Sequence, residues 1–205
     1  GLTTTYEYDS LGQLTRVNDP HAGKSTMYLY DCGGNMTGYL SAPYTLAPTL
    51  EGVNETVFYT YGDSNWKDKV TAIGGKAITY DAIGNPLTYD GWTFTWKAGR
   101  MLASMVKTGT NAQFTYDHNG LRIKKVVNGV TTNYTLNGKN VVHMTQGSHD
   151  LHFFYDAQGK PGMVTYNDVD YFYVYNLQGD VVALIDANGT QVVEYGYDAR
   201  GNPIS

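Results

Sequence analysis

The sequence is short of cysteine, of charge and of continuous hydrophobic stretches, and each shortage excludes a class of protein. Cys32 is the only cysteine among 205 residues, so no disulfide within the chain can hold the fold together. The longest clean apolar run, VVALI at 181–185, is far too short to cross a bilayer. Lysine and arginine number 14 against 19 acidic residues, so the chain lacks the basic footprint of a nucleic-acid-binding protein. We therefore expect no nucleic-acid partner and no insertion into a membrane.

Tyrosine and glycine, in contrast, are abundant, with 19 and 24 copies. Tyrosine and threonine favour strands, and glycine favours the turns between them. No stretch shows the 3.6-residue period of a helix. The composition therefore predicts an all-β fold.

The motif Tyr-Asp-x-x-Gly is repeated about every 20 residues. Full copies begin at residues 8, 30, 80, 116, 155 and 197, and degenerate copies begin at Tyr61, Trp96, Tyr134 and Tyr175. The spacing is interrupted once, between 30 and 61, by a segment with prolines at 43 and 48. We expect a surface loop near 41–54, within one repeat array that covers residues 1–205.

The aspartate and the glycine of each copy suit a tight turn. Asp at the first turn position can accept hydrogen bonds from the backbone that follows, and Gly at the fourth position supplies a positive φ. We expect further hairpin turns at VNGV (127–130), DANG (186–189) and IGGK (73–76). The predicted turn residues are Asp9, Gly12, Asp31, Gly34, Asp81, Gly84, Asp117, Gly120, Asp156, Gly159, Asp198 and Gly201.

Before most turns, aromatic residues alternate with other residues, as in YEY, YLY and YVY. Residues two apart share one face of a strand, so each repeat presents a pair of aromatics on one side. These pairs predict rows that hold antiparallel β-hairpins together in a continuous curved or spiral sheet, a partial β-shell. The rows would contain Tyr6, Tyr8, Tyr28, Tyr30, Tyr59, Tyr61, Tyr80, Phe114, Tyr116, Phe153, Tyr155, Tyr173, Tyr175, Tyr195 and Tyr197.

Several segments resemble the YD repeats of bacterial rearrangement-hotspot (Rhs) proteins. They are YDSLGQLTRV, YDAIGNPLTYDGWTFTWKAGRML and YFYVYNLQGDVVALIDANGTQVVEYGYDARGNP, and the last is similar to the start of the family's repeat-associated core. Related repeats occur in cocoon-forming Tc toxin subunits and in teneurins. The resemblance implies a hollow β-shell that encloses a C-terminal toxin domain in a secreted or cell-surface bacterial protein. This segment would form part of the wall.

The sequence departs from that family in one respect. Family members of the toxin type release their cargo by aspartyl self-cleavage at an Asp-Pro-x-Gly-type motif, and this motif is absent here. DPHAG at 19–23 shares only Asp-Pro and lies near the start of the repeats. We therefore expect no catalytic residue, no enzyme activity and no cofactor in this chain. Both ends of the sequence, GLTTTYEYD and GNPIS, are expected to be cut from something longer.

Some histidines and one tryptophan are candidates for binding sites. His149, Asp150 and His152 suggest a metal site, but 149 and 152 point to opposite faces of a strand and no fourth ligand is evident. We expect a solvated hairpin and no metal there, and interpret His21, His118 and His143 as isolated. The alternative to a wall is an extracellular carbohydrate-binding or adhesion module, for which Trp66 is the possible ligand contact. The terminal strands of a fragment would also favour self-association.

Overall fold

The computed structural model describes residues 3–198 and 201–203, and these residues form 19 β-strands and no helix. The predicted all-β fold of antiparallel hairpins is therefore confirmed. Among the described residues, no helix has the length and apolar character needed to cross a membrane.

The chain divides into two compact units, one up to Asp90 and one from Gly91. The first unit contains β1 (Thr5–Tyr8), β2 (Leu14–Asp19), β3 (Lys24–Tyr30), β4 (Met36–Pro43), β5 (Glu55–Thr60), β6 (Ala72–Ile73), β7 (Lys76–Tyr80) and β8 (Pro86–Tyr89). The second contains β9 (Trp92–Lys97), β10 (Met101–Lys107), β11 (Thr110–Tyr116), β12 (Arg122–Val127), β13 (Val130–Asn137), β14 (Asn140–Gln146), β15 (His149–Tyr155), β16 (Pro161–Tyr166), β17 (Val169–Tyr175), β18 (Val181–Ile185) and β19 (Gln191–Glu194).

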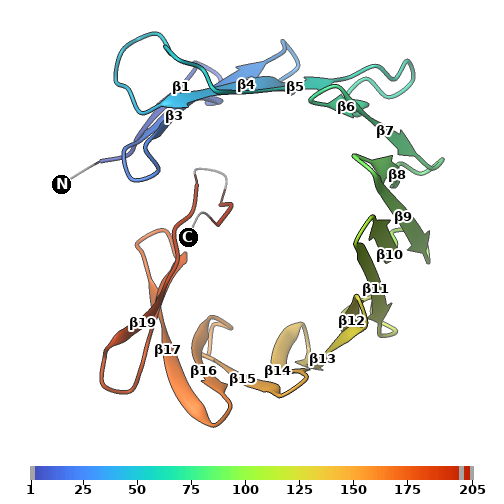
Figure 1. Cartoon of the computed structure of the whole chain (residues 1–205), viewed down its shortest axis with the longest axis vertical. Helices are drawn as coiled ribbons and strands as arrows, with labels where there is room; N and C mark the ends of the chain where they lie inside the picture. The colour runs from blue at the N-terminus through green and yellow to red at the C-terminus, as the bar shows by residue number, and fades with distance from the viewer. Residues whose placement is uncertain (1–2, 199–200, 204–205) are drawn as a thin grey trace. The chain divides into compact units, whose positions relative to one another are not determined.

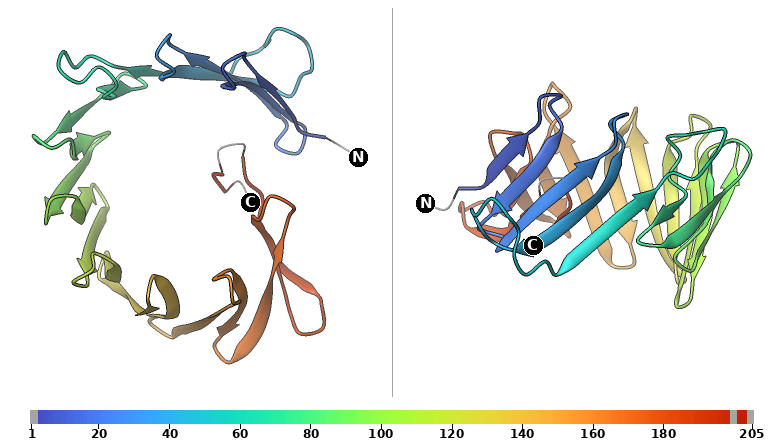
Figure 2. Two further views of the ribbon diagram at one scale, coloured as in Figure 1. Left: turned by 180° about the vertical axis from the view of Figure 1, so that it is seen from behind. Right: turned by 90° about the horizontal axis from the view of Figure 1, so that it is seen from above.

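Within each unit, every strand pairs antiparallel with the strand that follows it in the chain, from β1 to β8 and from β9 to β19. The ribbons accordingly lie side by side in chain order within each unit (Figures 1 and 2). The row of strands in the second unit follows an arc (Figure 1). Such a meander needs only short connections, since each strand pairs with its immediate neighbours.

Turns after odd-numbered and even-numbered strands lie on opposite edges of a meander, and here the two edges differ in chemistry. The Tyr-Asp-x-x-Gly turns follow odd-numbered strands, whereas two-residue turns, such as those after β6 and β12, follow most even-numbered strands. An exception is β18, which is followed by an Asp turn that begins at Asp186. At the second of these, Asn128 has φ 49° and Gly129 has φ 85°, the backbone of a type I′ hairpin. The hairpins predicted at VNGV, IGGK and DANG are confirmed.

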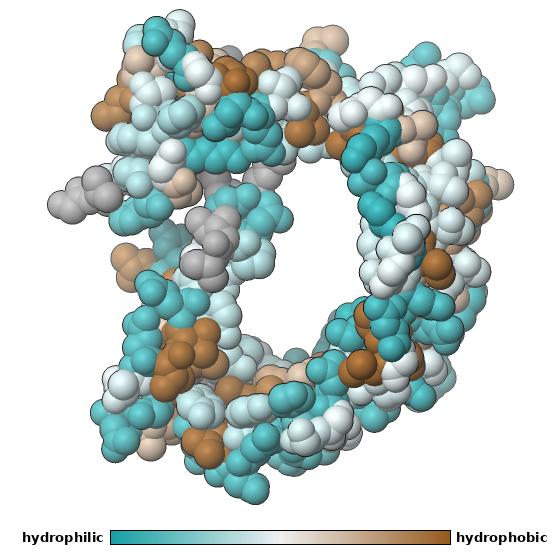
Figure 3. All heavy atoms as spheres, viewed as in Figure 1, coloured by the Kyte–Doolittle hydropathy of each residue, from teal (hydrophilic) through white to brown (hydrophobic). Residues whose placement is uncertain are grey.

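The two faces of a strand differ in burial, as the alternating sequence predicts. On β11, Ala112 and Phe114 are buried, whereas Asn111, Gln113 and Thr115 on the opposite face are exposed. The other buried hydrophobic side chains are also few and belong to the strands, namely Val17, Tyr28, Ala42, Val164 and Ala183. Hydrophobic residues form separate patches among hydrophilic ones in the space-filling view (Figure 3). Burial thus comes mainly from contacts between neighbouring strands.

The predicted surface loop begins three residues later than expected, because β4 continues through Pro43. Pro43 is the last residue of that strand, a position where a missing N–H does little harm. The loop over 44–54 is fixed by Arg16, which is only 4% exposed. Its guanidinium donates hydrogen bonds to the carbonyl oxygens of Thr45 and Pro48, each at 3.0 Å. The longer connection is therefore anchored to the sheet by one buried side chain.

Candidate functional site

The Asp turns form a regular network of hydrogen bonds, illustrated by Asp117. Its Oδ1 accepts hydrogen bonds from the N–H groups of Asn119 at 2.9 Å and Leu121 at 2.8 Å. The N–H of Gly120 donates to the Asp117 carbonyl, and Gly120 has φ 78°, which an L side chain rarely adopts. The same bond from the N–H four residues further on is accepted by Asp9, Asp31, Asp81, Asp156, Asp186 and Asp198.

The glycines of these turns share the left-handed backbone. Their φ angles lie between 76° and 93°, so the turn geometry needs a residue without a Cβ. These glycines are Gly12, Gly34, Gly84, Gly120, Gly159, Gly179, Gly189 and Gly201.

The hydrogen bonds of the turns also affect the aspartates. The side-chain hydrogen bond from Asn35 lowers the pKa of Asp31, and the backbone N–H of Asn85 lowers the pKa of Asp81.

In seven of the repeats, the motif tyrosine connects its turn to the preceding one. The Tyr116 hydroxyl donates to the carbonyl oxygen of Leu102 at 2.9 Å, and that of Tyr155 donates to Val141 at 2.8 Å. Both acceptors lie near the start of the neighbouring strand, just after the previous turn. Equivalent bonds join Tyr30 to Leu14, Tyr61 to Met36, Tyr80 to Val70, Tyr175 to Pro161 and Tyr197 to Val181.

A β-bulge places that tyrosine. The register shifts at Tyr116 and at Tyr155, where one extra residue bends the strand and re-aims the side chain. In both cases the tyrosine pairs with the residue six positions later, Arg122 or Pro161. The spacing of six recurs at Tyr8, Tyr30, Tyr80, Tyr175 and Tyr197.

The predicted aromatic rows are mostly half-buried. Tyr28 and Phe114 are buried at 8% and 7% exposure, whereas Tyr6 and Tyr8 on β1 are 50% and 61% exposed. Burial raises the pKa of Tyr173 to about 12. The remaining members are half-buried: Tyr30, Tyr59, Tyr61, Tyr80, Tyr116, Phe153, Tyr155, Tyr173, Tyr175, Tyr195 and Tyr197.

Trp66, the possible ligand contact, lies against a turn of the sheet. Its ring covers Gly84 so closely that a Cβ built on Gly84 would lie 2.6 Å from the indole. The ammonium group of Lys69 lies 5.6 Å from the indole centroid and also pairs with Asp63. That hydrogen-bonded pairing lowers the pKa of Asp63 to about 2. The indole is 48% exposed, so one face packs on the turn and part of the ring remains open to solvent.

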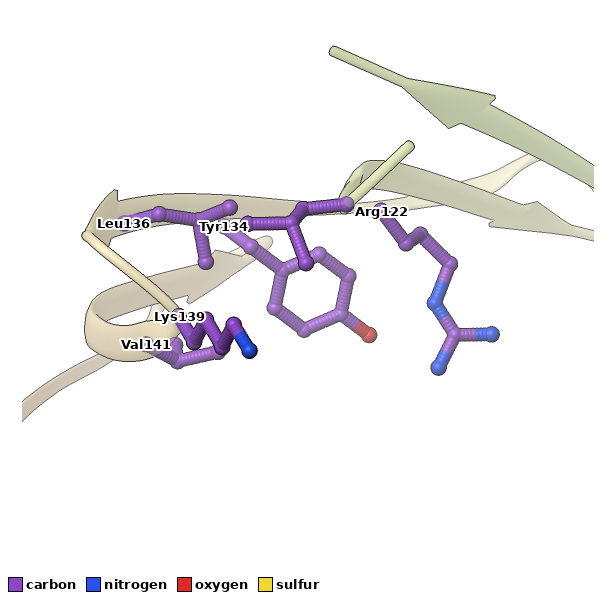
Figure 4. Close-up of a pocket in the computed structure, with 6 residues that line it drawn as sticks. Arg122, Tyr134, Leu136, Lys139 and Val141 are labelled. Carbon is purple, nitrogen blue, oxygen red and sulfur yellow. The ribbon is translucent and has the colours of Figure 1, made fainter. Parts of the chain in front are cut away.

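Cationic side chains lie on the aromatic rings at several places along the sheet. The Arg122 guanidinium is 5.3 Å from the centroid of Phe114 and 6.0 Å from that of Tyr134. It borders a shallow hollow of about 170 Å³ that Leu136 and Val141 also line (Figure 4). Such cation–π contacts are worth about 0.5–1 kcal/mol at exposed sites. The aromatic ring of Tyr134 and the positive charge of Arg122 therefore both line this hollow.

A second hollow, of about 330 Å³, lies on the second unit and is mainly apolar. The strands from β15 to β19 supply its side chains. It is lined by Leu151, Val164, Tyr166, Tyr171, Leu184, Val192 and Val193.

Three side chains from β14 and β15 form a cluster that the sequence analysis missed. The Asp150 carboxylate lies 3.0 Å from Nε2 of His143 and 3.0 Å from Nε2 of His152. The interpretation of His143 as isolated was wrong, because the register places it directly opposite His152. His149 points to the other face, where its Nδ1 lies 2.7 Å from the Tyr166 hydroxyl. The hydrogen bond from His143 is the largest effect that lowers the pKa of Asp150.

Comparison with known proteins identifies relatives of the whole chain. The family model described as teneurin YD-shell matches residues 1–205. The tRNA3(Ser)-specific nuclease WapA of Bacillus spizizenii is 34% identical over 204 residues, and the tRNA nuclease WapA of Bacillus subtilis (strain 168) is 33% identical over the same length. Each alignment covers 96% of this chain and only 8% of the relative. The chain therefore spans less than a tenth of the length of these nucleases.

Solved structures show the same fold at low identity. The TcdB2-TccC3-Cdc42 crystal structure superimposes with a TM-score of 0.66, and a Photorhabdus luminescens Tc holotoxin pore with a TM-score of 0.64. Both are 16% identical and cover 98% of this chain and 12% of the other. The likeness extends the fold assignment to Tc toxin components.

Proposed function

Because this chain belongs to the teneurin YD-shell family, we propose that it is a wall segment of an encapsulating β-shell and that it catalyses no reaction itself. Its immediate partner would be the remainder of its own repeat chain. The chain would act as a structural scaffold, and its regular sheet would itself perform that function.

The observation that carries this proposal is the series of tyrosine hydroxyls bonded to backbone carbonyls. The bond from Tyr116 to Leu102, for example, crosses from the end of β11 to the start of β10. Each such bond is worth about 0.5–1.5 kcal/mol, and seven of the ten repeats carry one. In repeat proteins, stability is approximately the sum of such nearest-neighbour contacts. A wall built in this way can be extended by adding repeats.

We infer that the cargo is a toxin domain elsewhere in the polypeptide. The WapA relatives are named as tRNA nucleases, and the part aligned with this chain is a small fraction of them. A nuclease domain outside the aligned repeats, enclosed by the shell, would account for both facts. Secretion or display at a bacterial cell surface would then deliver the cargo.

The carbohydrate-binding alternative has weaker support from the rows themselves. A sugar-binding platform needs exposed ring faces and free hydroxyl groups. In the rows, the hydroxyls of Tyr116 and Tyr155 are bonded to the backbone, and Phe114 is buried. Trp66 keeps an exposed part and is the place where a glycan contact would be sought first.

The test uses the full-length polypeptide in which this segment occurs. We expect its native mass to equal the summed masses of its denatured pieces, with a C-terminal piece severed from the chain yet retained in the particle. That piece should resist protease until denaturant opens the shell. The same piece expressed alone is the control and should be digested. A single uncleaved polypeptide with a protease-sensitive C-terminal region would count against encapsulation, and glycan binding would be measured next.

A further inference from the structure

We propose that His143, Asp150 and His152 form a binding site for a divalent transition-metal ion such as Zn²⁺ on the polar face of the β14–β15 hairpin. This site is independent of the wall function. It requires only this hairpin, whose strands are joined by the two-residue turn Gly147–Ser148.

Backbone pairing places all three side chains on one face. His143 pairs with His152, and Thr145 pairs with Asp150, so the two histidines lie directly opposite each other. Asp150 is two residues from His152 and therefore shares its face. The imidazole rings stack with centroids 4.2 Å apart and planes 12° apart. The hairpin thus fixes two imidazoles and one carboxylate before any ion arrives.

The distances between donor atoms suit a single ion. One donor atom from each residue can be chosen so that all lie within 4.8 Å of one another. Two nitrogens bound at about 2.1 Å to the same tetrahedral Zn²⁺ are about 3.4 Å apart. A contraction of at most about 1.4 Å is therefore enough. Small side-chain rotations can supply it, since the side chains of Asp150 and His152 are 49% and 51% exposed.

The donor set selects the class of metal. Imidazole nitrogens suit Zn²⁺, Cu²⁺ and Ni²⁺, whereas Ca²⁺ and Mg²⁺ require mostly oxygen ligands. Three protein ligands leave a fourth tetrahedral position for water or for a donor from another molecule. Because the cluster faces solvent, that position would be accessible.

The residues directly across from the two histidines on the adjacent strands are both threonines. Thr135 lies across from His143 on β13, and Thr165 lies across from His152 on β16. Hydroxyl groups at these positions could hydrogen-bond to bound water. The bound ion would replace the present hydrogen bonds between the imidazoles and Asp150.

Calorimetric titration of the full 205-residue chain with Zn²⁺ tests the proposal. We expect one binding site per chain, and an affinity that falls about tenfold or more in each of His143→Ala, Asp150→Asn and His152→Ala, since even outer-shell losses cost 10–100-fold. His149→Ala is the matched control, because it removes a histidine of the same strand from the opposite face. Its Zn²⁺ affinity should equal that of the wild type. Equal losses in the control, or wild-type affinity in the His143→Ala/His152→Ala double variant, would overturn the proposal.

A measurement without substitutions excludes misfolding as an explanation. Zn²⁺ added to the wild-type chain should shift the imidazole NMR signals of His143 and His152 and leave those of His149 in place. Shifts spread over all the histidines, or no shift at millimolar Zn²⁺, would show that the cluster is only a hydrogen-bonded group.

Discussion

Replacing Gly84 with alanine should cost more stability than the same change in other YD turns, because Trp66 lies against this turn. Gly84 has φ 85°, and a Cβ there would be 2.6 Å from the indole. Gly159 occupies the same place in YDAQG with φ 80°, and its nearest neighbour to a new Cβ is 3.9 Å away. Both substitutions therefore place an alanine in left-handed backbone, but only Gly84→Ala also brings a Cβ into collision with the Trp66 indole.

The expected magnitudes follow from these two terms. Left-handed backbone costs an alanine about 1–2 kcal/mol, which is the whole expected loss for Gly159→Ala. The indole of Trp66 is 48% exposed, so its buried half is about 100 Å². At about 25 cal/mol per Å², displacing it costs up to about 2.5 kcal/mol. Gly84→Ala should therefore lose up to about 3.5–4.5 kcal/mol, the sum of the backbone and burial terms.

Chemical denaturation followed by circular dichroism measures both variants in wild-type and Trp66→Ala backgrounds. Without the indole, the cost of Gly84→Ala should fall to the backbone term of about 1–2 kcal/mol. The coupling in the cycle should then equal the burial term, up to about 2.5 kcal/mol. The cost of Gly159→Ala should be the same in both backgrounds. A Gly84→Ala cost that does not depend on Trp66 would refute the packing argument.

Three further predictions concern other contacts. Tyr116→Phe should lower the free energy of unfolding by about 1 kcal/mol, whereas Tyr134→Phe, for which the structure records no hydroxyl hydrogen bond, should change it little by the same denaturation assay. The pKa of Asp63 is lowered from 3.8 to about 2, so its ionised carboxylate should stabilise the fold fully above pH 3.8 and lose that effect as the pH falls through 2. In Lys69→Met, carboxyl NMR should show the pKa of Asp63 rising toward 3.8. Arg16→Met should speed limited proteolysis in the loop after β4, since it removes both bonds to that loop, and an unchanged cleavage rate would contradict the anchoring role.

Much of the fold could be predicted from the sequence because the repeated motif marks where strands end and turns begin. Tyr116, Asp117 and Gly120 mark the end of one strand and the turn after it, and the same letters recur elsewhere. The loop boundary could not be predicted as well. Pro43 is a strand breaker by propensity, yet the end of β4 tolerates it because the ladder stops there.

The histidine cluster was harder to predict because it depends on register between strands. Within β15, the alternation correctly separates His149 from His152. His143 lies on another strand, and only the pairing of Thr145 with Asp150 brings it opposite His152. A two-residue turn at Gly147–Ser148 would have predicted that register. The signal was therefore present, but it lay in the turn length and not in any histidine motif.

The degenerate repeats explain why an imperfect motif still builds a regular sheet. At WKAGR, lysine replaces the motif aspartate, and the turn after β9 instead uses positive φ at both Ala98 and Gly99. Lys97 points onward to the Tyr116 ring, 5.3 Å from its centroid, and donates to the Phe114 carbonyl. In this repeat the Asp turn is absent, and Lys97 contacts the next repeat through its ammonium group. Single letters of the motif therefore vary between the repeats of this chain while the order of the strands stays the same.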